Sequence, residues 1–202
     1  MSGARILLAG ILGGIAMFLW MSIAHIATPL GEVGFKEIPN EQAVMSAMTM
    51  AIGSSEGLYI FPGMGVPPDA SRDQKRAAMS NYQQLLDKYP SGIMVYKPAG
   101  QKAMTMGQLG REFGFEVLEA LLLAVLLSMT ARKTFGSRMG LAVVVGLLAA
   151  VTTNLSYWNW YGFPSNYTMA TMFVELMKYV VAGVVVALIA GKGKAKASVA
   201  VA

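Results

Sequence analysis

The sequence predicts a mainly α-helical membrane protein: a bundle of four transmembrane helices with a small α+β extracytoplasmic cap between helices 1 and 2. Its 202 residues are 55% hydrophobic and only 13% charged, whereas soluble domains carry about 25% charged residues. The apolar residues form long runs, as a bilayer requires. The net charge of +5 comes from Lys and Arg clusters beside these runs. This pattern is typical of membrane topology signals rather than of a nucleic-acid-binding face.

The first predicted transmembrane helix occupies residues 1–28 and ends before Pro29. At about 1.5 Å per residue, this run crosses a hydrocarbon core about 30 Å thick. A cleaved signal peptide is the alternative interpretation, because Ser22-Ile23-Ala24 forms a small-x-small cleavage site.

Residues 29–105 are expected to form the α+β cap outside the membrane. Pro39-Asn40-Glu41 predicts a helix start with Asn40 as the N-cap, and a second helix is expected over residues 70–89. Residues 57–61 and 93–96 have the composition of short strands. A segment of about 75 residues is too small to bury a large core. We therefore expect it to rest on the membrane surface or on a partner.

Three further transmembrane helices are predicted, over residues 106–131, 139–156 and 167–190. An aromatic outer loop, residues 157–166, is expected between the last two. Its aromatic side chains belong at the headgroup level; they are Tyr157, Trp158, Trp160, Tyr161 and Phe163. Residues 191–202 form a basic tail that we expect to be disordered.

Orientation follows from the basic residues near the ends of the spans. One side of the membrane carries these residues and no acidic residue; they are Arg5, Arg132, Lys133, Arg138, Lys192, Lys194 and Lys196. Such a side is cytoplasmic. Both termini are therefore expected in the cytoplasm, and residues 29–105 on the opposite side of the membrane.

Small residues recur at a spacing that lets membrane helices approach closely. Gly10 and Gly14 are four residues apart in the first span, as are Gly110 and Gly114 in the second. This small-xxx-small pattern predicts helix–helix contacts at both pairs.

Five ionisable residues form a predicted intramembrane polar cluster: His25, Glu116, Glu119, Glu175 and Lys178. Glu116 and Glu119 share a helix face, and so do Glu175 and Lys178. A charge in hydrocarbon costs roughly 3 kcal/mol or more, so these groups should face inward and pair. Three interpretations remain open: a buried ion pair that fixes helix register, a proton or ion site, or a bound metal. Since there is only one histidine, we expect no metal site.

Other chemistry has little support in the sequence. Cysteine is absent, which excludes disulfides, thiolate metal sites and cysteine nucleophiles. Met48-Thr49-Met50 and Met104-Thr105-Met106 leave Cu(I) binding open as an alternative to simple apolar filling. No phosphate-binding loop or nucleophile elbow is present. We therefore predict no catalytic residues, no cofactor and no enzyme activity.

Several segments resemble an uncharacterised family of small bacterial four-span inner-membrane proteins. They are residues 30–34, 39–44, 57–63 and 158–163. The resemblance implies the same four-span layout and a bacterial origin, and therefore a bacterial inner membrane with residues 29–105 in the periplasm. It implies no catalytic residue.

The function expected from these features is that of a non-catalytic accessory or scaffold subunit of a larger respiratory or photosynthetic membrane complex. The expected partners are the lipid bilayer and other membrane-protein subunits, without nucleic acid. The alternative is a small ion-, proton- or metal-handling membrane protein built on the polar cluster.

Overall fold

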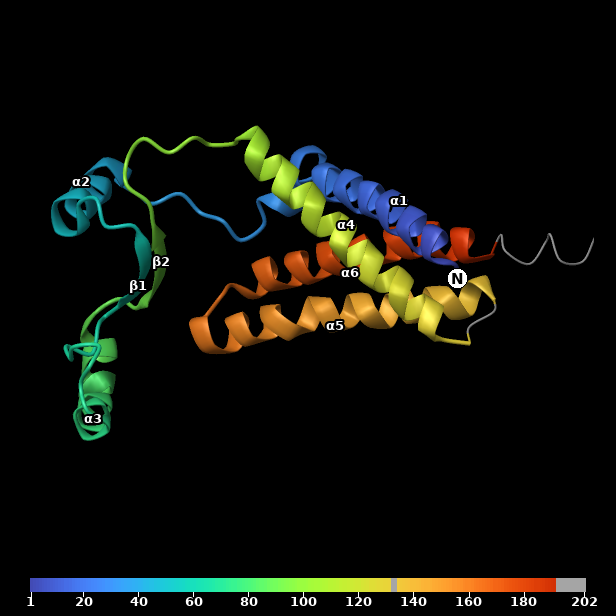
Figure 1. Cartoon of the computed structure of the whole chain (residues 1–202). Helices are drawn as coiled ribbons and strands as arrows, with labels where there is room; N and C mark the ends of the chain where they lie inside the picture. Colours follow the sequence, from blue (N-terminus) through green and yellow to red (C-terminus); the bar gives the residue numbers. More distant parts are fainter. Residues whose placement is uncertain (132–133, 192–202) are drawn as a thin grey trace, which may run out of the picture. The chain divides into compact units, whose positions relative to one another are not determined.

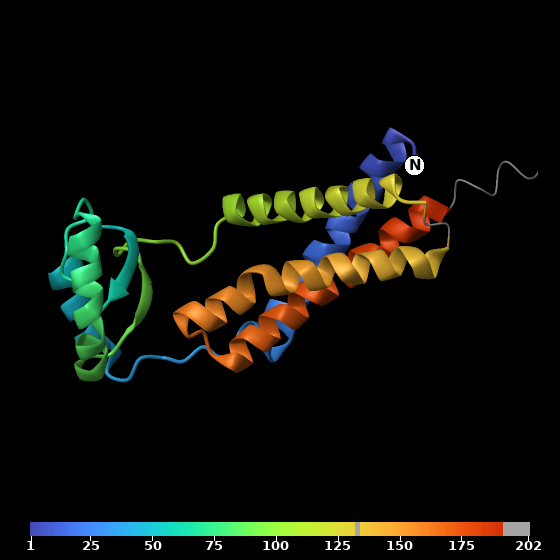
Figure 2. The same cartoon turned by 90° about the horizontal axis from the view of Figure 1, so that it is seen from below.

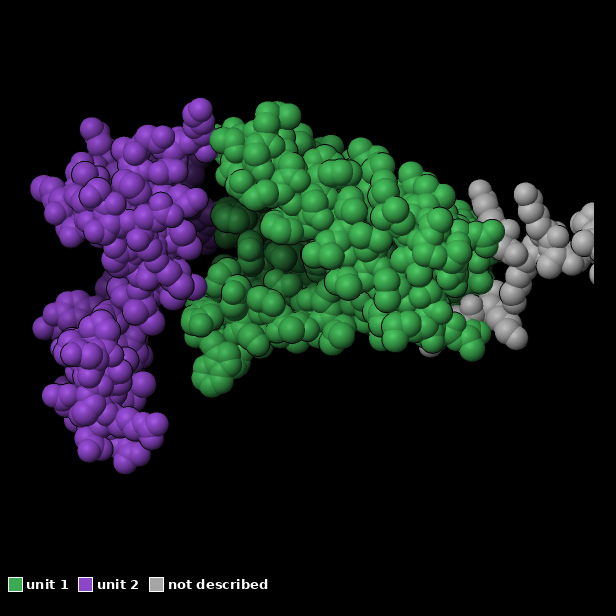
Figure 3. All heavy atoms as spheres, in the orientation of Figure 1, with its two compact units in different colours: residues 1–35, 103–202 green, residues 36–102 purple. Residues whose placement is uncertain are grey.

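The computed structural model describes residues 1–131 and 134–191. The chain forms two compact units, residues 1–35 with 103–202, and residues 36–102 (Figure 3). The predicted basic tail after residue 191 and residues 132–133 lie outside the described part of the chain.

The first unit, residues 1–35 with 103–202, is a helical bundle. Its long helices are α1 (Gly3–Ser22), α4 (Met106–Met129), α5 (Phe135–Tyr161) and α6 (Ser165–Gly191), and short turns η1 (Ile23–Ala27, π-helical) and η2 (Pro29–Gly31, 3-10) follow α1. The long helices run back and forth, so the start of α1 and the end of α6 lie at the same end of the bundle (Figures 1 and 2). Helix α1 packs against α4 and α6, and α5 packs against α6.

Small residues make the contact between α1 and α4, as the first glycine pair predicts. A Cβ added at Gly14 would lie 2.5 Å from the Cα of Val117, and one at Gly10 would overlap Leu121. The prediction for Gly110 and Gly114 is wrong, because both face open space. The buried face of α4 starts at Glu116. Gly114 precedes it by two residues, at about 100° per residue, and therefore lies on the opposite face.

Three helices of the described chain are long and apolar enough to cross a membrane: Gly3–Ala27, Phe135–Tyr161 and Ser165–Gly191. They correspond to the first, third and fourth predicted spans and indicate a membrane protein. The prediction of a mainly helical protein with a small sheet is thus confirmed; the described residues form one two-stranded sheet. Helix α4 is not among the three, because it is interrupted by charged side chains; they are Arg111, Glu112, Glu116 and Glu119.

The predicted aromatic loop is largely helical. Helix α5 continues through Tyr161 and ends at Gly162, whose φ of 68° is left-handed. Residues 157–161 contain neither Gly nor Pro, so nothing in them stops the helix before Gly162. The ring of Tyr157 stacks on Phe163 with 5.4 Å between centroids, and this contact closes the turn into α6.

The second unit, residues 36–102, contains α2 (Glu41–Ile52), β1 (Gly57–Phe61), α3 (Arg72–Lys88) and β2 (Gly92–Tyr96). The strands pair antiparallel, with Leu58 opposite Val95, and they match the predicted strands closely. The predicted helix start is confirmed, because α2 begins at Glu41 with Asn40 as its N-cap residue. Asn40 has a left-handed φ of 54°, and its side chain makes no capping hydrogen bond. All of residues 36–102 are described, and none of them is buried.

Candidate functional site

Three carboxylates surround one lysine in the helical bundle. The Nζ atom of Lys178 lies 2.8 Å from Oε2 of Glu119, 2.8 Å from Oε1 of Glu175 and 3.8 Å from Oε1 of Glu116. Four of the five residues of the predicted polar cluster therefore meet at one point. We call these four residues the Lys178 cluster.

Helix geometry places these side chains. Glu116 and Glu119 are three residues apart on α4, and Glu175 and Lys178 are three residues apart on α6, so each pair shares a helix face. Helices α4 and α6 both pack on α1 but contact each other over few residues. The Lys178 cluster is thus the main polar link between α4 and α6.

Burial differs among the four members. Glu116 is 1% exposed and Lys178 is 4% exposed, whereas Glu119 and Glu175 are partly accessible. The Oε2 atom of Glu116 is buried without a hydrogen-bond partner. Fully ionised, the cluster would carry one positive and three negative charges. A buried carboxylate without full compensation is strongly unfavourable, so the arrangement favours binding of a further positive charge or a proton.

Tyr179 adds a side chain that the sequence analysis did not single out. Its ring centroid lies 5.6 Å from Nζ of Lys178, and the residue is 8% exposed. Its position next to Lys178 in the sequence is the feature that could have identified it as part of the site. Its polar hydroxyl needs a partner when the ring is buried.

His25 is not part of the Lys178 cluster. It lies in the π-helical turn η1, where its Nδ1 is 2.9 Å from the carbonyl oxygen of Met21, and its side chain is exposed. An i→i+5 turn changes the helical phase, so the face of His25 does not follow from the α-helical spacing of α1.

A pocket of about 170 Å³ nevertheless connects His25 with the cluster. Its lining includes His25, Tyr167, Thr171 and Glu175. Glu175 therefore belongs both to the pocket wall and to the Lys178 cluster. The segment after η2 closes one side, because Gly34 approaches so near to Tyr167 that a Cβ there would lie 2.5 Å from the tyrosine Cβ.

Among residues 1–131 and 134–191, no group of three His, Asp or Glu side chains is placed to hold a metal ion. The methionines considered for copper belong to both units: Met50 lies near the C-terminal end of α2, and Met106 is the first residue of α4. Of the predicted interface aromatics, Tyr157, Trp158, Trp160 and Tyr161 are exposed on α5.

Two further contacts between helices involve residues that the sequence did not mark as structural. The indole Nε1 of Trp20 donates a 2.9 Å hydrogen bond to the carbonyl oxygen of Val174, next to Glu175. Arg138, considered only as an orientation signal, is 8% exposed and donates to the carbonyl oxygen of Ala187 at 3.1 Å.

Comparison with known proteins gave no match to a family model, to a curated protein or to a solved structure.

Proposed function

We propose that this chain is a non-catalytic integral membrane protein that acts as an accessory or scaffold subunit of a larger complex in a bacterial inner membrane, respiratory or photosynthetic. One observation carries the proposal: residues 36–102 bury none of their own side chains and present an apolar sheet face. A unit with this surface is suited to holding a partner subunit.

The apolar sheet face consists of Leu58, Ile60 and Val95, which are 71%, 64% and 72% exposed. Leu58 lies opposite Val95 in the register, and Ile60 is two residues farther along β1. Side chains at these positions project to the same side of a sheet. Clustered exposed apolar residues of this kind mark interaction surfaces.

A protein fits this face better than an anionic lipid surface or a nucleic acid. Residues 36–102 contain seven Lys and Arg and six Asp and Glu. Anionic lipids and nucleic acids attract concentrated basic charge, which this nearly balanced unit does not offer. An apolar face on another membrane subunit is the complementary partner.

The proposal includes α4 as a fourth span. Its 24 residues reach about 36 Å at about 1.5 Å per residue. Glu116 and Glu119 turn toward Lys178, while exposed apolar residues cover the outside of α4; they are Phe115, Leu118, Leu122, Leu126 and Met129. The other two charged residues of α4, Arg111 and Glu112, are exposed within its first two turns. A helix whose deeper charges pair inward, and whose remaining charges lie near one end, is compatible with lipid.

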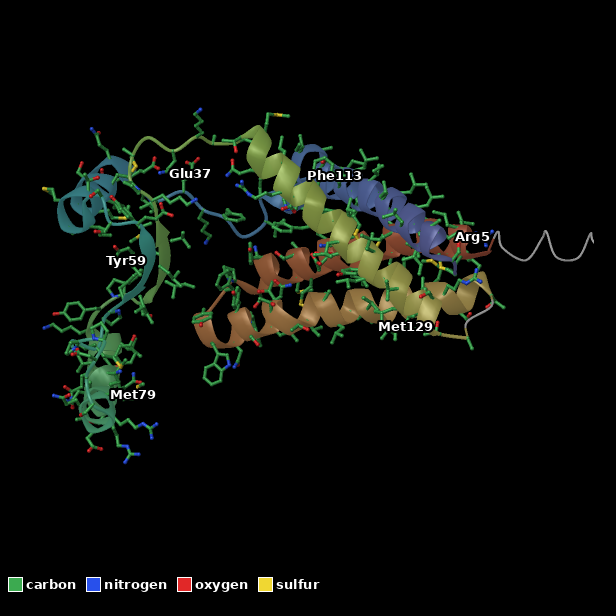
Figure 4. All side chains as sticks on the ribbon, in the orientation of Figure 1. Arg5, Glu37, Tyr59, Met79, Phe113 and Met129 are labelled. Carbon is green, nitrogen blue, oxygen red and sulfur yellow. The ribbon has the colours of Figure 1, made fainter. Side chains whose placement is uncertain are left out.

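Four spans put both termini on one side. Arg5 on α1 and Met129 on α4 lie at the same end of the bundle (Figure 4), where the sequence also places its basic residues. The positive-inside rule makes that end cytoplasmic and makes residues 36–102 periplasmic.

The test is gentle detergent extraction from the native membrane, followed by mass spectrometry of the proteins that co-migrate with the chain. Defined membrane subunits in fixed stoichiometry are expected. Leu58→Asp should release them, whereas Gln84→Asp, which adds the same charge to an exposed site on α3, should not. A chain that migrates alone in the wild type, or equal retention by both variants, contradicts the proposal.

A further inference from the structure

We propose that the Lys178 cluster is a proton-binding site, with the proton held on Glu116 and exchanged through the pocket lined by His25 and Glu175. An accessory role alone leaves unexplained why three carboxylates face a single ammonium group. One glutamate would suffice for an ion pair between α4 and α6.

Glu116 is the member suited to hold the proton. Its side chain is 2% exposed, and its nearer oxygen lies 3.8 Å from Nζ of Lys178, against 2.8 Å for Glu119 and Glu175. Its other oxygen, Oε2, is buried without a hydrogen-bond partner. The Oε2 atom of Glu119 is also buried, but it lies 2.8 Å from Nζ of Lys178. The two partly accessible glutamates therefore pair with the ammonium, and Glu116 is the most costly of the three to leave ionised.

The balance of charge around Glu116 also favours its protonated form. Helix α6 contributes Lys178 and Glu175, and α4 contributes Glu119 and Glu112. Tyr179 on α6 lies beside Lys178. Helix α1 has no ionisable residue between Arg5 and His25, and α5 has none between Arg138 and Tyr157. The negative groups near Glu116 thus outnumber the positive ones, and a proton lowers this imbalance.

Glu175 connects the buried proton to the outside. It lines the pocket of about 170 Å³ and also lies 2.8 Å from Nζ of Lys178. A proton that reaches the pocket is taken up by the Glu175 carboxylate. As Nζ of Lys178 closes its 3.8 Å distance to Glu116, it donates one proton to Glu116 and takes one from Glu175, so the ammonium group stays charged throughout. The reverse sequence releases the proton.

The experiment is infrared spectroscopy of the full chain in lipid, with the carbonyl stretch of a protonated carboxyl as the readout. The wild type is expected to show this band at neutral pH, and Glu116→Gln is expected to lose it. Glu112→Gln is the matched control, since Glu112 is exposed one turn earlier on α4, and should retain the band. Absence of the band in the wild type overturns the proposal without any variant. Its survival in Glu116→Gln overturns the assignment to Glu116.

Access is tested by hydrogen–deuterium exchange of the same band. Thr171→Trp places a large ring in the pocket and is expected to slow the deuterium shift of the band several-fold. Phe173→Trp, at an exposed position on α6 outside the pocket lining, should exchange at the wild-type rate. Equal rates in both variants would show that the pocket is not the path. These readouts are independent of partner subunits, so they separate this inference from the proposed accessory function.

Discussion

At the scale of single residues, Lys178 determines how the bundle tolerates charge. It is the one cation among the four members of its cluster, and its Nζ touches side chains from both α4 and α6. A buried ion pair contributes little to the free energy of unfolding, but removing one partner lowers that free energy strongly, because the remaining charge stays buried without compensation.

We therefore expect Lys178→Met to lower the free energy of unfolding by about 3–5 kcal/mol. Adding Glu119→Gln and Glu175→Gln to this variant should recover part of the loss, since fewer unpaired carboxylates remain. Denaturant unfolding in detergent, followed by circular dichroism, measures the effect. Lys97→Met, at an exposed site, is the control and should leave stability unchanged. A triple variant no more stable than Lys178→Met would refute the charge explanation.

At the scale of secondary-structure elements, two glycine pairs with identical spacing have different roles. Gly10 and Gly14 let α1 approach the backbone of α4, while Gly110 and Gly114 face open space. The spacing of the glycines shows that a helix face lacks side chains, so another helix can approach it closely. Whether a helix contact forms there depends on whether that face is turned toward another helix.

This difference predicts opposite outcomes for one substitution. Gly14→Ala forces a methyl group against the Val117 backbone, and such overpacking costs about 1–3 kcal/mol. Gly114→Ala meets no atom and gains helix propensity, by at most about 1 kcal/mol. Thermal unfolding of the two purified variants in the same detergent compares them. Equal destabilisation by both would mean that α1 and α4 do not meet at Gly14.

The sequence predicted elements best where local chemistry decides them. The strand Gly57–Phe61 was predicted at its observed bounds, because it lies between a glycine and a proline. Glu116, Glu119, Glu175 and Lys178 were expected to meet because they share faces and depth. His25 was misplaced since the π-helical turn η1 shifts the helical phase without a distinctive residue. The helical aromatic segment 157–161 was missed because its composition fits either a loop at the headgroups or a helix end.

At the scale of the whole molecule, the proposed function depends on membrane topology. The question is whether α4 crosses the membrane. If it does, the start of α5 and residues 36–102 lie on opposite sides of the membrane. The absence of native cysteine makes this question directly accessible by thiol labelling.

We expect a membrane-impermeant thiol reagent to label Ser80→Cys on α3 from the periplasmic side of intact cells with a permeable outer membrane. Ser2→Cys and Gly136→Cys should react only after lysis, because the proposed four-span topology places both in the cytoplasm. All three positions are suited to labelling, since Ser2, Ser80 and Gly136 are exposed. Labelling of both Ser80→Cys and Gly136→Cys in intact cells would mean that α4 does not span.

The hydrogen bond between Trp20 and the carbonyl oxygen of Val174 has an optical consequence. The chain has three tryptophans, and Trp158 and Trp160 are exposed on α5. Replacing both by phenylalanine leaves a single indole, anchored one residue before Glu175. Its emission would then follow the polarity at the junction of α1 and α6 without any added dye. The protein thus contains its own fluorescent probe next to Glu175 of the Lys178 cluster.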